Sequence, residues 1–157
     1  MKVIFPGSFD PITKGHMDII ERASKVFGEV IVLIMDNPSK EYTFSKEMRL
    51  AMIETCIQNL PNVTSDSSTG LTIDYAKKHH IQGLIRGIRE VMDYEYEMQQ
   101  ATINMLLDPQ IETFFLLSRP EYSFLSSSAT KIVAKNKGDI TRFVPKCISD
   151  VIKSYYQ

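Results

Sequence analysis

A histidine at the start of a predicted helix is the first residue of this chain whose surroundings suggest chemistry. The segment Pro6–His16 (PGSFDPITKGH) follows a short apolar run and leads into an amphipathic stretch. Gly7 and Gly15 allow the backbone to approach a ligand closely, and the N–H groups at a helix start attract an anion. His16 can donate a hydrogen bond to a phosphate oxygen, and Ser8 adds a hydroxyl donor. The segment therefore predicts a phosphate site, although a helix-capping histidine would explain the same position.

The same segment excludes two common nucleotide-binding classes. The chain contains neither GxxxxGK[ST] nor GxGxxG, so a P-loop kinase is excluded and an ordinary NAD-binding module is disfavoured. Asp10 lies in a segment with two prolines and two glycines, which favour turns. We therefore interpret Asp10 as a turn residue rather than a catalytic base.

Cationic side chains follow two other apolar runs. Lys40 comes shortly after the run 30–35, and Arg86 comes directly after Leu84-Ile85, with Arg89 three residues later. Arginine suits bidentate phosphate contacts better than lysine does. We therefore predict that Arg86 and Arg89 bind phosphate, whereas Lys40 alone carries little weight because exposed lysines are usually only solvated.

Three consecutive serines, 126–128, follow the last apolar run. They are expected to begin a helix that runs to about Lys137, with Gly138 as its stop. A single serine is enough for an N-cap, so the run predicts a second helix N-terminus that binds phosphate. Lys131 would lie one turn into this helix, on a side that could reach the same anion.

Five apolar runs predict the strands that must position these residues. They lack strict alternation, which is typical of parallel strands covered on both faces. Their alternation with helical patterns predicts right-handed βαβ units. We therefore expect one α/β domain over residues 1–157, a doubly wound parallel five-stranded sheet with helices on both faces, whose ligands bind at the carboxyl ends of the strands. The predicted strands are 3–5, 30–35, 63–65 (the weakest), 84–85 and 114–117.

The predicted helices have apolar stripes at helical spacing. One stripe lies on 17–27, and another lies on 48–60 with Ser45 as its N-cap. A long stripe on 91–105, ended by Asp108-Pro109, is expected to pack on the core. Its neighbours Ile103, Leu106 and Leu107 fit either a subunit interface or core packing. A last helix, on 148–155, could be opened by Pro145.

Composition limits the remaining classes of function. The formal net charge of the 157 residues is −1, which argues against a nucleic-acid partner. No apolar run approaches the roughly 20 residues of a membrane span, and the start of the chain has no secretory pattern. No metal cage is expected, since His79 and His80 are adjacent and lack a carboxylate partner. We expect a cytoplasmic protein with Cys56 and Cys147 as free thiols, although the sequence leaves a disulfide open.

Four motifs in order resemble the bacterial phosphopantetheine adenylyltransferase family of the nucleotidyltransferase superfamily. They are PGSFDPITKGH at 6–16, NPSK at 37–40, LIRGIRxVxDYEYEMQ at 84–99 and EYSFLSSS at 121–128. The resemblance covers almost the whole chain. It implies a Rossmann-like domain, a homohexamer, and adenylyl transfer from ATP to 4′-phosphopantetheine, which gives dephospho-coenzyme A and pyrophosphate. It also implies feedback binding of coenzyme A.

The resemblance assigns roles residue by residue. Thr13–His16 (TKGH) stands for the superfamily's HxGH motif, so His16 stabilises the transition state, with Ser8, Lys40 and Arg86 as further catalytic residues. The substrate-binding positions are Ser8, Lys40, Arg86 and, least securely, Thr72. The ATP-binding positions are Ser8, Phe9, His16, Gly87, Ile88, Arg89, Glu97, Tyr122, Ser123, Phe124, Leu125, Ser126, Ser127 and Ser128. Leu125 departs from the family's usual Ile, and Glu41 from a Lys found in some relatives.

The implied reaction fits these residue types. The attacking phosphate oxygen is already ionised, so no general base is needed, and catalysis rests on alignment and charge neutralisation. Mg²⁺ is expected to arrive with ATP, held mainly by phosphate and water. The alternatives are a sister enzyme with another acceptor, such as nicotinate mononucleotide or glycerol phosphate, and a nucleotide-binding module without turnover.

Overall fold

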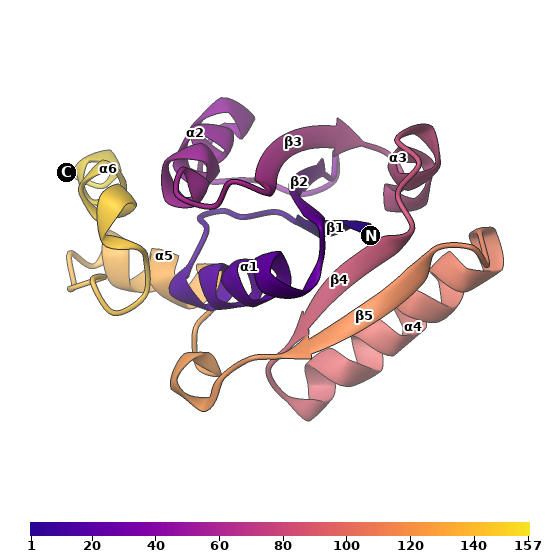
Figure 1. Cartoon of the computed structure of the whole chain (residues 1–157). Helices are drawn as coiled ribbons and strands as arrows, with labels where there is room; N and C mark the ends of the chain where they lie inside the picture. The colour runs from indigo at the N-terminus through magenta and orange to yellow at the C-terminus, as the bar shows by residue number, and fades with distance from the viewer.

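The computed structural model describes residues 1–157, and it contains one five-stranded sheet in which every strand pair is parallel (Figure 1). The strand order is β3-β2-β1-β4-β5. All five predicted strands are confirmed, including the weakest, and the order is that of a doubly wound sheet. The strands are β1 (Lys2–Gly7), β2 (Glu29–Asp36), β3 (Val63–Thr69), β4 (Gly83–Ile88) and β5 (Glu112–Leu117).

Helices cover both faces of the sheet, as predicted. Apolar side chains of α1 and α2 share one buried cluster with β1 and β2, whereas those of α3 pack in a second cluster on the opposite face. The helices are α1 (Lys14–Val26), α2 (Lys46–Ile57), α3 (Thr72–Lys78), α4 (Val91–Leu107), the short 3₁₀ turn η1 (Pro120–Tyr122), α5 (Ser127–Lys135) and α6 (Lys146–Tyr155).

Strand β1 shows how the sequence fills both clusters. Val3 and Phe5 belong to the larger cluster, whereas Ile4, between them, belongs to the smaller one. Successive side chains of a strand point to opposite faces. A continuous apolar run is therefore what a central strand with two covered faces requires.

Two helix N-termini are capped by the residues that the sequence offers. The Thr13 side chain accepts from the His16 backbone N–H, and the His16 ring accepts from the Thr13 backbone N–H, which makes a reciprocal capping box. Ser45 accepts from the N–H of Met48 at the start of α2, as predicted. These caps fix where both helices begin, and α1 begins at the predicted phosphate site.

Two expectations for the helices are wrong. The stripe on α4 does not pack in the core, because no residue of this helix is buried, and its apolar side chains remain exposed on the single chain. Helix α5 ends at Lys135 rather than Lys137. The left-handed residue that ends it is Lys137, with φ of 57°, and Gly138 donates its N–H back to the Val133 carbonyl.

The topology also creates a place for a ligand. The chain winds outward from β1 to β2 and β3, then crosses back to β4 and β5. The carboxyl ends of β1 and β4 therefore form the switch point of the sheet, where ligands bind in folds of this kind.

No helix in the structure combines the length and the hydropathy that a membrane span requires.

Candidate active site

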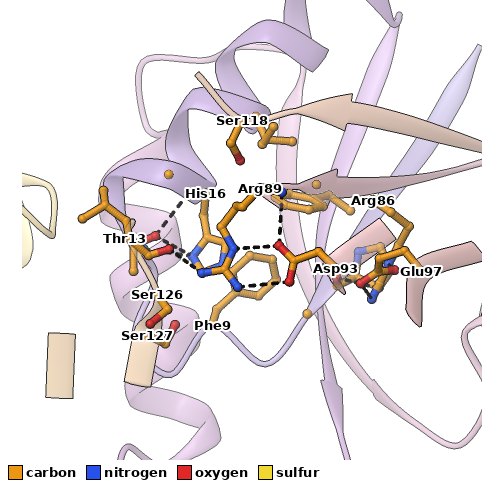
Figure 2. A pocket seen from close by; sticks show the side chains of 17 residues that line it. Phe9, Thr13, His16, Arg86, Arg89, Asp93, Glu97, Ser118, Ser126 and Ser127 are labelled. Atoms are coloured by element: carbon orange, nitrogen blue, oxygen red, sulfur yellow. Dashed lines mark hydrogen bonds and ion pairs between the residues drawn. The ribbon is translucent and has the colours of Figure 1, made fainter. Parts of the chain in front are cut away.

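A cavity of about 240 Å³ lies at this switch point (Figure 2). The ends of β1 and β4 form part of its wall, and the N-termini of α1 and α5 and one side of α4 form the rest. Its lining residues are Phe5, Pro6, Gly7, Phe9, Thr13, Gly15, His16, Ile19, Arg86, Gly87, Arg89, Asp93, Glu97, Ser118, Leu125, Ser126 and Ser127. Segments that are far apart in the sequence thus bring two arginines, one histidine and a serine-capped helix start together.

His16 is held in place by its own helix cap. Its Nδ1 accepts the backbone N–H of Thr13 at 3.0 Å, and its ring packs edge-on against Phe9, with 5.0 Å between ring centroids. Since Nδ1 is an acceptor, the proton of the neutral ring lies on Nε2. Nε2 has no partner in the protein and is not buried. The capping role and the anion-binding role are therefore compatible, because each uses a different ring nitrogen.

The surroundings of His16 keep its ring neutral. Burial, and then the positive charge of Arg89, lower the pKa of His16 from 6.5 to about 4. Near neutral pH this histidine is a fixed hydrogen-bond donor and carries no positive charge. It can therefore stabilise a growing negative charge on an oxygen without a proton transfer.

Arg86 lies at the end of β4 and is oriented by α4. Its Nε donates to Oε2 of Glu97, its Nη2 donates to Oε1 of Glu97 at 2.8 Å, and its Nη1 donates to the Pro6 carbonyl at 3.3 Å. A guanidinium has five N–H donors, so two remain for an anion. The carboxylate orients the guanidinium in the cavity.

Arg89 is arranged in the same way. It is joined to Asp93 at 3.1 Å, and its Nη1 donates to the Leu125 carbonyl at 2.7 Å. Figure 2 shows Asp93 facing Arg89 and Glu97 facing Arg86. Asp93 is therefore part of the cavity wall rather than of a solvated helix face. Its spacing of four residues from Arg89 was the pattern that could have indicated the pair.

The serine run provides the second helix start, as predicted. Ser126 is the N-cap of α5 and accepts the N–H of Ala129 at 3.0 Å. Ser127 donates its hydroxyl proton to the Pro11 carbonyl at 2.7 Å, which ties α5 to the first loop. The first N–H groups of a helix have no partner within it, and both serines line the cavity. This end of α5 can therefore bind an anion.

Lys131 does not face this anion site. Its Nζ is 2.9 Å from Oδ2 of Asp10, which is buried and accepts the backbone N–H groups of Thr43 and Phe44. Burial raises the pKa of Asp10, but these donors outweigh that effect and hold it below its ordinary value. Asp10 is an ionised structural anchor, which agrees with its interpretation as something other than a base. The expectation for Lys131 is wrong because Asp10 is a nearer partner.

Ser8 and Lys40 lie beside each other but outside the cavity lining. The Lys40 Nζ is 3.4 Å from Oγ of Ser8. The buried Arg49, which was not among the predicted site residues, supports Ser8: it donates to the Ser8 carbonyl at 2.9 Å and to Asp36 at 2.7 Å. Arg49 lies in the first turn of α2, on the face that also carries the buried Ile53 and Ile57, so its spacing could have indicated that it is buried.

The predicted ATP-binding positions divide into two groups. The first group lines the cavity with the histidine, arginines, glutamate and serines described above, and it consists of Phe9, Gly87 and Leu125. The second group does not line it, and besides Ser8 it consists of Ile88, Tyr122, Ser123, Phe124 and Ser128. The predicted substrate-binding residue Thr72, which begins α3, does not line the cavity either. Ser118, which follows β5, lines the cavity and was missed, although the rule that ligands meet strand ends could have found it.

The arrangement can bind and polarise a chain of phosphates. It offers two guanidinium groups, a neutral imidazole donor and a helix N-terminus around one cavity. The structure contains no group of three or more His, Cys, Asp or Glu side chains that could hold a metal ion. The Thr13 hydroxyl lies 3.1 Å from Nδ1 of His16, but both groups are engaged in the cap of α1. These groups can support electrostatic stabilisation of a phosphoryl-type reaction.

Comparison with known proteins gives concordant results. The model of a cytidylyltransferase-like family matches residues 4–133. The chain is 50% identical over 149 residues to a phosphopantetheine adenylyltransferase of Alkaliphilus metalliredigens (strain QYMF), covering 94% of this chain and 95% of that protein. It is also 50% identical over 156 residues to a phosphopantetheine adenylyltransferase of Gloeothece citriformis (strain PCC 7424), covering 99% of each.

A solved structure shares the fold. It comes from Vibrio parahaemolyticus and is provisionally named a nicotinate-nucleotide adenylyltransferase. Its TM-score is 0.74 at 16% identity, over 99% of this chain and 95% of that chain. At this identity the likeness concerns the Rossmann-like architecture alone.

Proposed function

The chain belongs to the phosphopantetheine adenylyltransferase family, within the cytidylyltransferase-like proteins, and we propose that it transfers the adenylyl group of ATP to 4′-phosphopantetheine. The products are dephospho-coenzyme A and pyrophosphate, and the reaction is a late, reversible step of coenzyme A synthesis. The observation that carries the proposal is the cavity at the β1/β4 switch point, where His16, Arg86, Arg89 and the start of α5 converge.

The proposed reaction is a direct in-line displacement. A phosphate oxygen of the acceptor attacks the α-phosphorus of ATP, and the bond from that phosphorus to the bridging oxygen breaks as pyrophosphate leaves. The attacking oxygen is already ionised, so no base has to remove a proton and no covalent intermediate forms. The residues contribute by alignment and by stabilising charge on the α-phosphate.

His16 is the proposed transition-state donor. Its Nε2–H is free because Nδ1 is engaged by Thr13, and the low pKa keeps this tautomer at working pH. A donor that needs no reorganisation during the reaction gives the strongest electrostatic stabilisation. Lys40 and Ser8, which lie 3.4 Å apart, are proposed to hold the acceptor phosphate beside it.

The two arginines divide the remaining phosphates. Arg86, oriented by Glu97, is proposed to bind the acceptor phosphate with its two remaining N–H donors. Arg89 and the start of α5 at Ser127 are proposed to hold the β- and γ-phosphates that leave together. Thr72 is proposed to contact the pantetheine arm, at the carboxyl end of β3.

The other ATP positions are proposed to surround the nucleotide. They are Phe9, Gly87, Ile88, Glu97 and the segment 122–128. Mg²⁺ is proposed to enter as part of the MgATP substrate, with ligands from phosphate and water, because the cavity's own carboxylates are engaged by arginines.

Pyrophosphate release tests the proposal directly. The protein would be mixed with MgATP and with 4′-phosphopantetheine, nicotinate mononucleotide or glycerol phosphate in separate assays. We expect release with 4′-phosphopantetheine alone. Release with another acceptor would keep adenylyl transfer but overturn the assigned acceptor. Binding of ATP without release from any mixture would indicate a nucleotide-binding module.

The proposed working form is a cytoplasmic homohexamer without nucleic-acid or membrane partners. Support for assembly comes from α4, whose large apolar side chains are exposed on the single chain, with Leu106 at 81% and Val91 at 75%. Light scattering should give about six times the 17.9 kDa chain mass, and Leu106→Lys should reduce that mass.

Coenzyme A, which shares the product's groups, is proposed to inhibit by binding the same site, and added coenzyme A should raise the KM for 4′-phosphopantetheine.

A further inference from the structure

The two cysteines, which are 91 positions apart in sequence, lie side by side between two helices. Cys56 is on the last turn of α2 and Cys147 is the second residue of α6, and their Sγ atoms are 3.6 Å apart. In a disulfide the sulfur atoms are about 2.0 Å apart. The helices pack closely enough for Cα atoms of the two to lie within 8 Å. The two sulfur atoms are already in contact, so a disulfide needs only a further approach of these two side chains.

Helix α6, whose second residue is Cys147, packs mainly on α2. Helix α6 buries Ile148 and Ile152 in the larger core cluster, and its Tyr155 hydroxyl donates to the Thr43 carbonyl at 2.9 Å. An element that packs on few others opens locally more easily than a central strand does. A covalent link at the start of α6 would prevent this opening and keep those side chains in the core.

We propose that Cys56 and Cys147 form a reversible disulfide that links α6 to α2. Cys147 is exposed, whereas Cys56 is only partly accessible. Cys147 is therefore the thiol that meets a dissolved oxidant. Cys56 reacts in the second step, with the sulfur atom that already lies against it.

The environment of Cys56 suits this second role. Burial, and then its contact with the Cys147 thiol, raise the pKa of the Cys56 thiol. Such a thiol reacts slowly with small oxidants from solution. Contact with its partner sulfur compensates for this, because the second step is intramolecular.

The oxidant is a low-molecular-weight disulfide such as oxidised glutathione. The Cys147 thiolate attacks one glutathione sulfur, the S–S bond of the oxidant breaks, and the first glutathione leaves and takes up the proton that Cys147 lost. The Cys56 thiol then loses its proton, attacks Sγ of Cys147 and releases the second glutathione thiol. The protein loses two electrons and two hydrogens in all, and the glutathione disulfide is reduced to two thiols.

The link is independent of the proposed adenylyl transfer. Neither cysteine lines the cavity at the switch point. Pyrophosphate release is therefore expected to be the same before and after oxidation, at temperatures well below unfolding. Failure of one proposal has no bearing on the other.

Intact-mass spectrometry after treatment with oxidised glutathione tests the pairing. Wild type should lose the mass of two hydrogens, carry no glutathione, stay a single chain on a non-reducing denaturing gel, and yield a tryptic peptide pair joined through Cys56 and Cys147. Cys56→Ser should instead accumulate one glutathione on Cys147, and Cys147→Ser should react far more slowly. A wild-type protein that keeps both thiols, retains glutathione on Cys147 or links two chains would overturn the proposal.

Thermal unfolding and hydrogen exchange test what the link does. Oxidation should raise the wild-type midpoint by on the order of 10 °C and slow amide exchange in α6, and dithiothreitol should reverse both changes. The Cys56→Ser, Cys147→Ser double variant should respond to neither reagent. An oxidised, internally linked wild type with an unchanged midpoint and unchanged exchange in α6 would rule out the stabilising role.

Discussion

The two sides of the cavity are built on different principles. On the β1–α1 side, α1 buries five of its residues, and the loop before it is anchored by Asp10 and by the capping box of Thr13 and His16. On the β4–α4 side, α4 buries none of its residues, yet it supplies the carboxylates that orient Arg86 and Arg89. The first side is fixed by the core, and the second is held mainly by ion pairs within the site.

The carboxylates show the difference most clearly. The Asp10 side chain is 5% exposed and accepts two backbone N–H groups in addition to Lys131, whereas the Asp93 side chain is 24% exposed and pairs only within the cavity wall. Buried, fully satisfied ion pairs are costly to disrupt, and partly solvated pairs contribute little to stability. We therefore expect changes near Asp10 to affect folding and changes on α4 to affect ligand binding.

The largest expected effect is on the fixed side. His16→Ala removes the proposed donor to the α-phosphate, and kcat for pyrophosphate release should fall by on the order of 10²–10³. The thermal midpoint should fall by only a few degrees, because the lost ring accepts one backbone N–H in the cap of α1. His80→Asn is a matched control, since His80 is exposed and in the left-handed region that asparagine tolerates. A His16→Ala enzyme within a few-fold of wild type would contradict the assigned role.

The second effect is on folding. Asp10→Asn leaves Lys131 without its charge partner. The NH₂ group of the new amide also faces a backbone N–H that a carboxylate oxygen accepted. The free energy of unfolding should therefore fall by about 3 kcal/mol. Thermal unfolding would report this as a drop of roughly 10 °C. Asp150→Asn, at an exposed position, provides the comparison. Equal midpoints for the two variants would show that Asp10 is not an anchor.

The third effect is on the α4 side and should leave folding almost intact. Glu97→Gln keeps the shape of the side chain but weakens its hold on Arg86, so kcat/KM for both substrates should fall roughly ten-fold. The free energy of unfolding should change by less than about 1 kcal/mol, because the pair is partly solvated. Glu95→Gln, exposed on the same helix, should change neither quantity. A large loss of stability in Glu97→Gln would remove the contrast between the two sides.

The last effect concerns pH and is small near neutrality. The pKa of His16 is lowered to about 4 in the folded protein from an ordinary value of 6.5, by burial and by Arg89. Between pH 6.5 and 4 the unfolded chain therefore binds a proton on this ring that the folded protein does not bind. The free energy of unfolding that the neutral ring contributes above pH 6.5 is lost as the pH falls towards 4. The midpoint of wild type should fall more than that of His16→Ala over this range. Parallel curves would mean that the ring is not held neutral.

Much of the site was predictable because its residues follow apolar runs. His16, Arg86, Arg89, Ser126 and Ser127 stand at predicted strand ends or helix starts, and all five line one cavity. The spacing of four residues from Arg89 could have indicated Asp93, whereas Arg49 was missed because its partners, Ser8 and Asp36, lie in other segments. Lys131 was misassigned for the same reason, since Asp10 is 121 positions away in sequence.

The sequence by itself determined the strands, the helix starts and the placement of polar residues at their ends. Those features depend on local periodicity, capping and turn chemistry, which act over a few residues. Only the tertiary structure decided which cation faces the cavity, that α4 lies outside the core, and that Cys56 meets Cys147. Each of those outcomes depends on packing between segments that are distant in the chain, where the nearest opposite charge or apolar surface decides the partner.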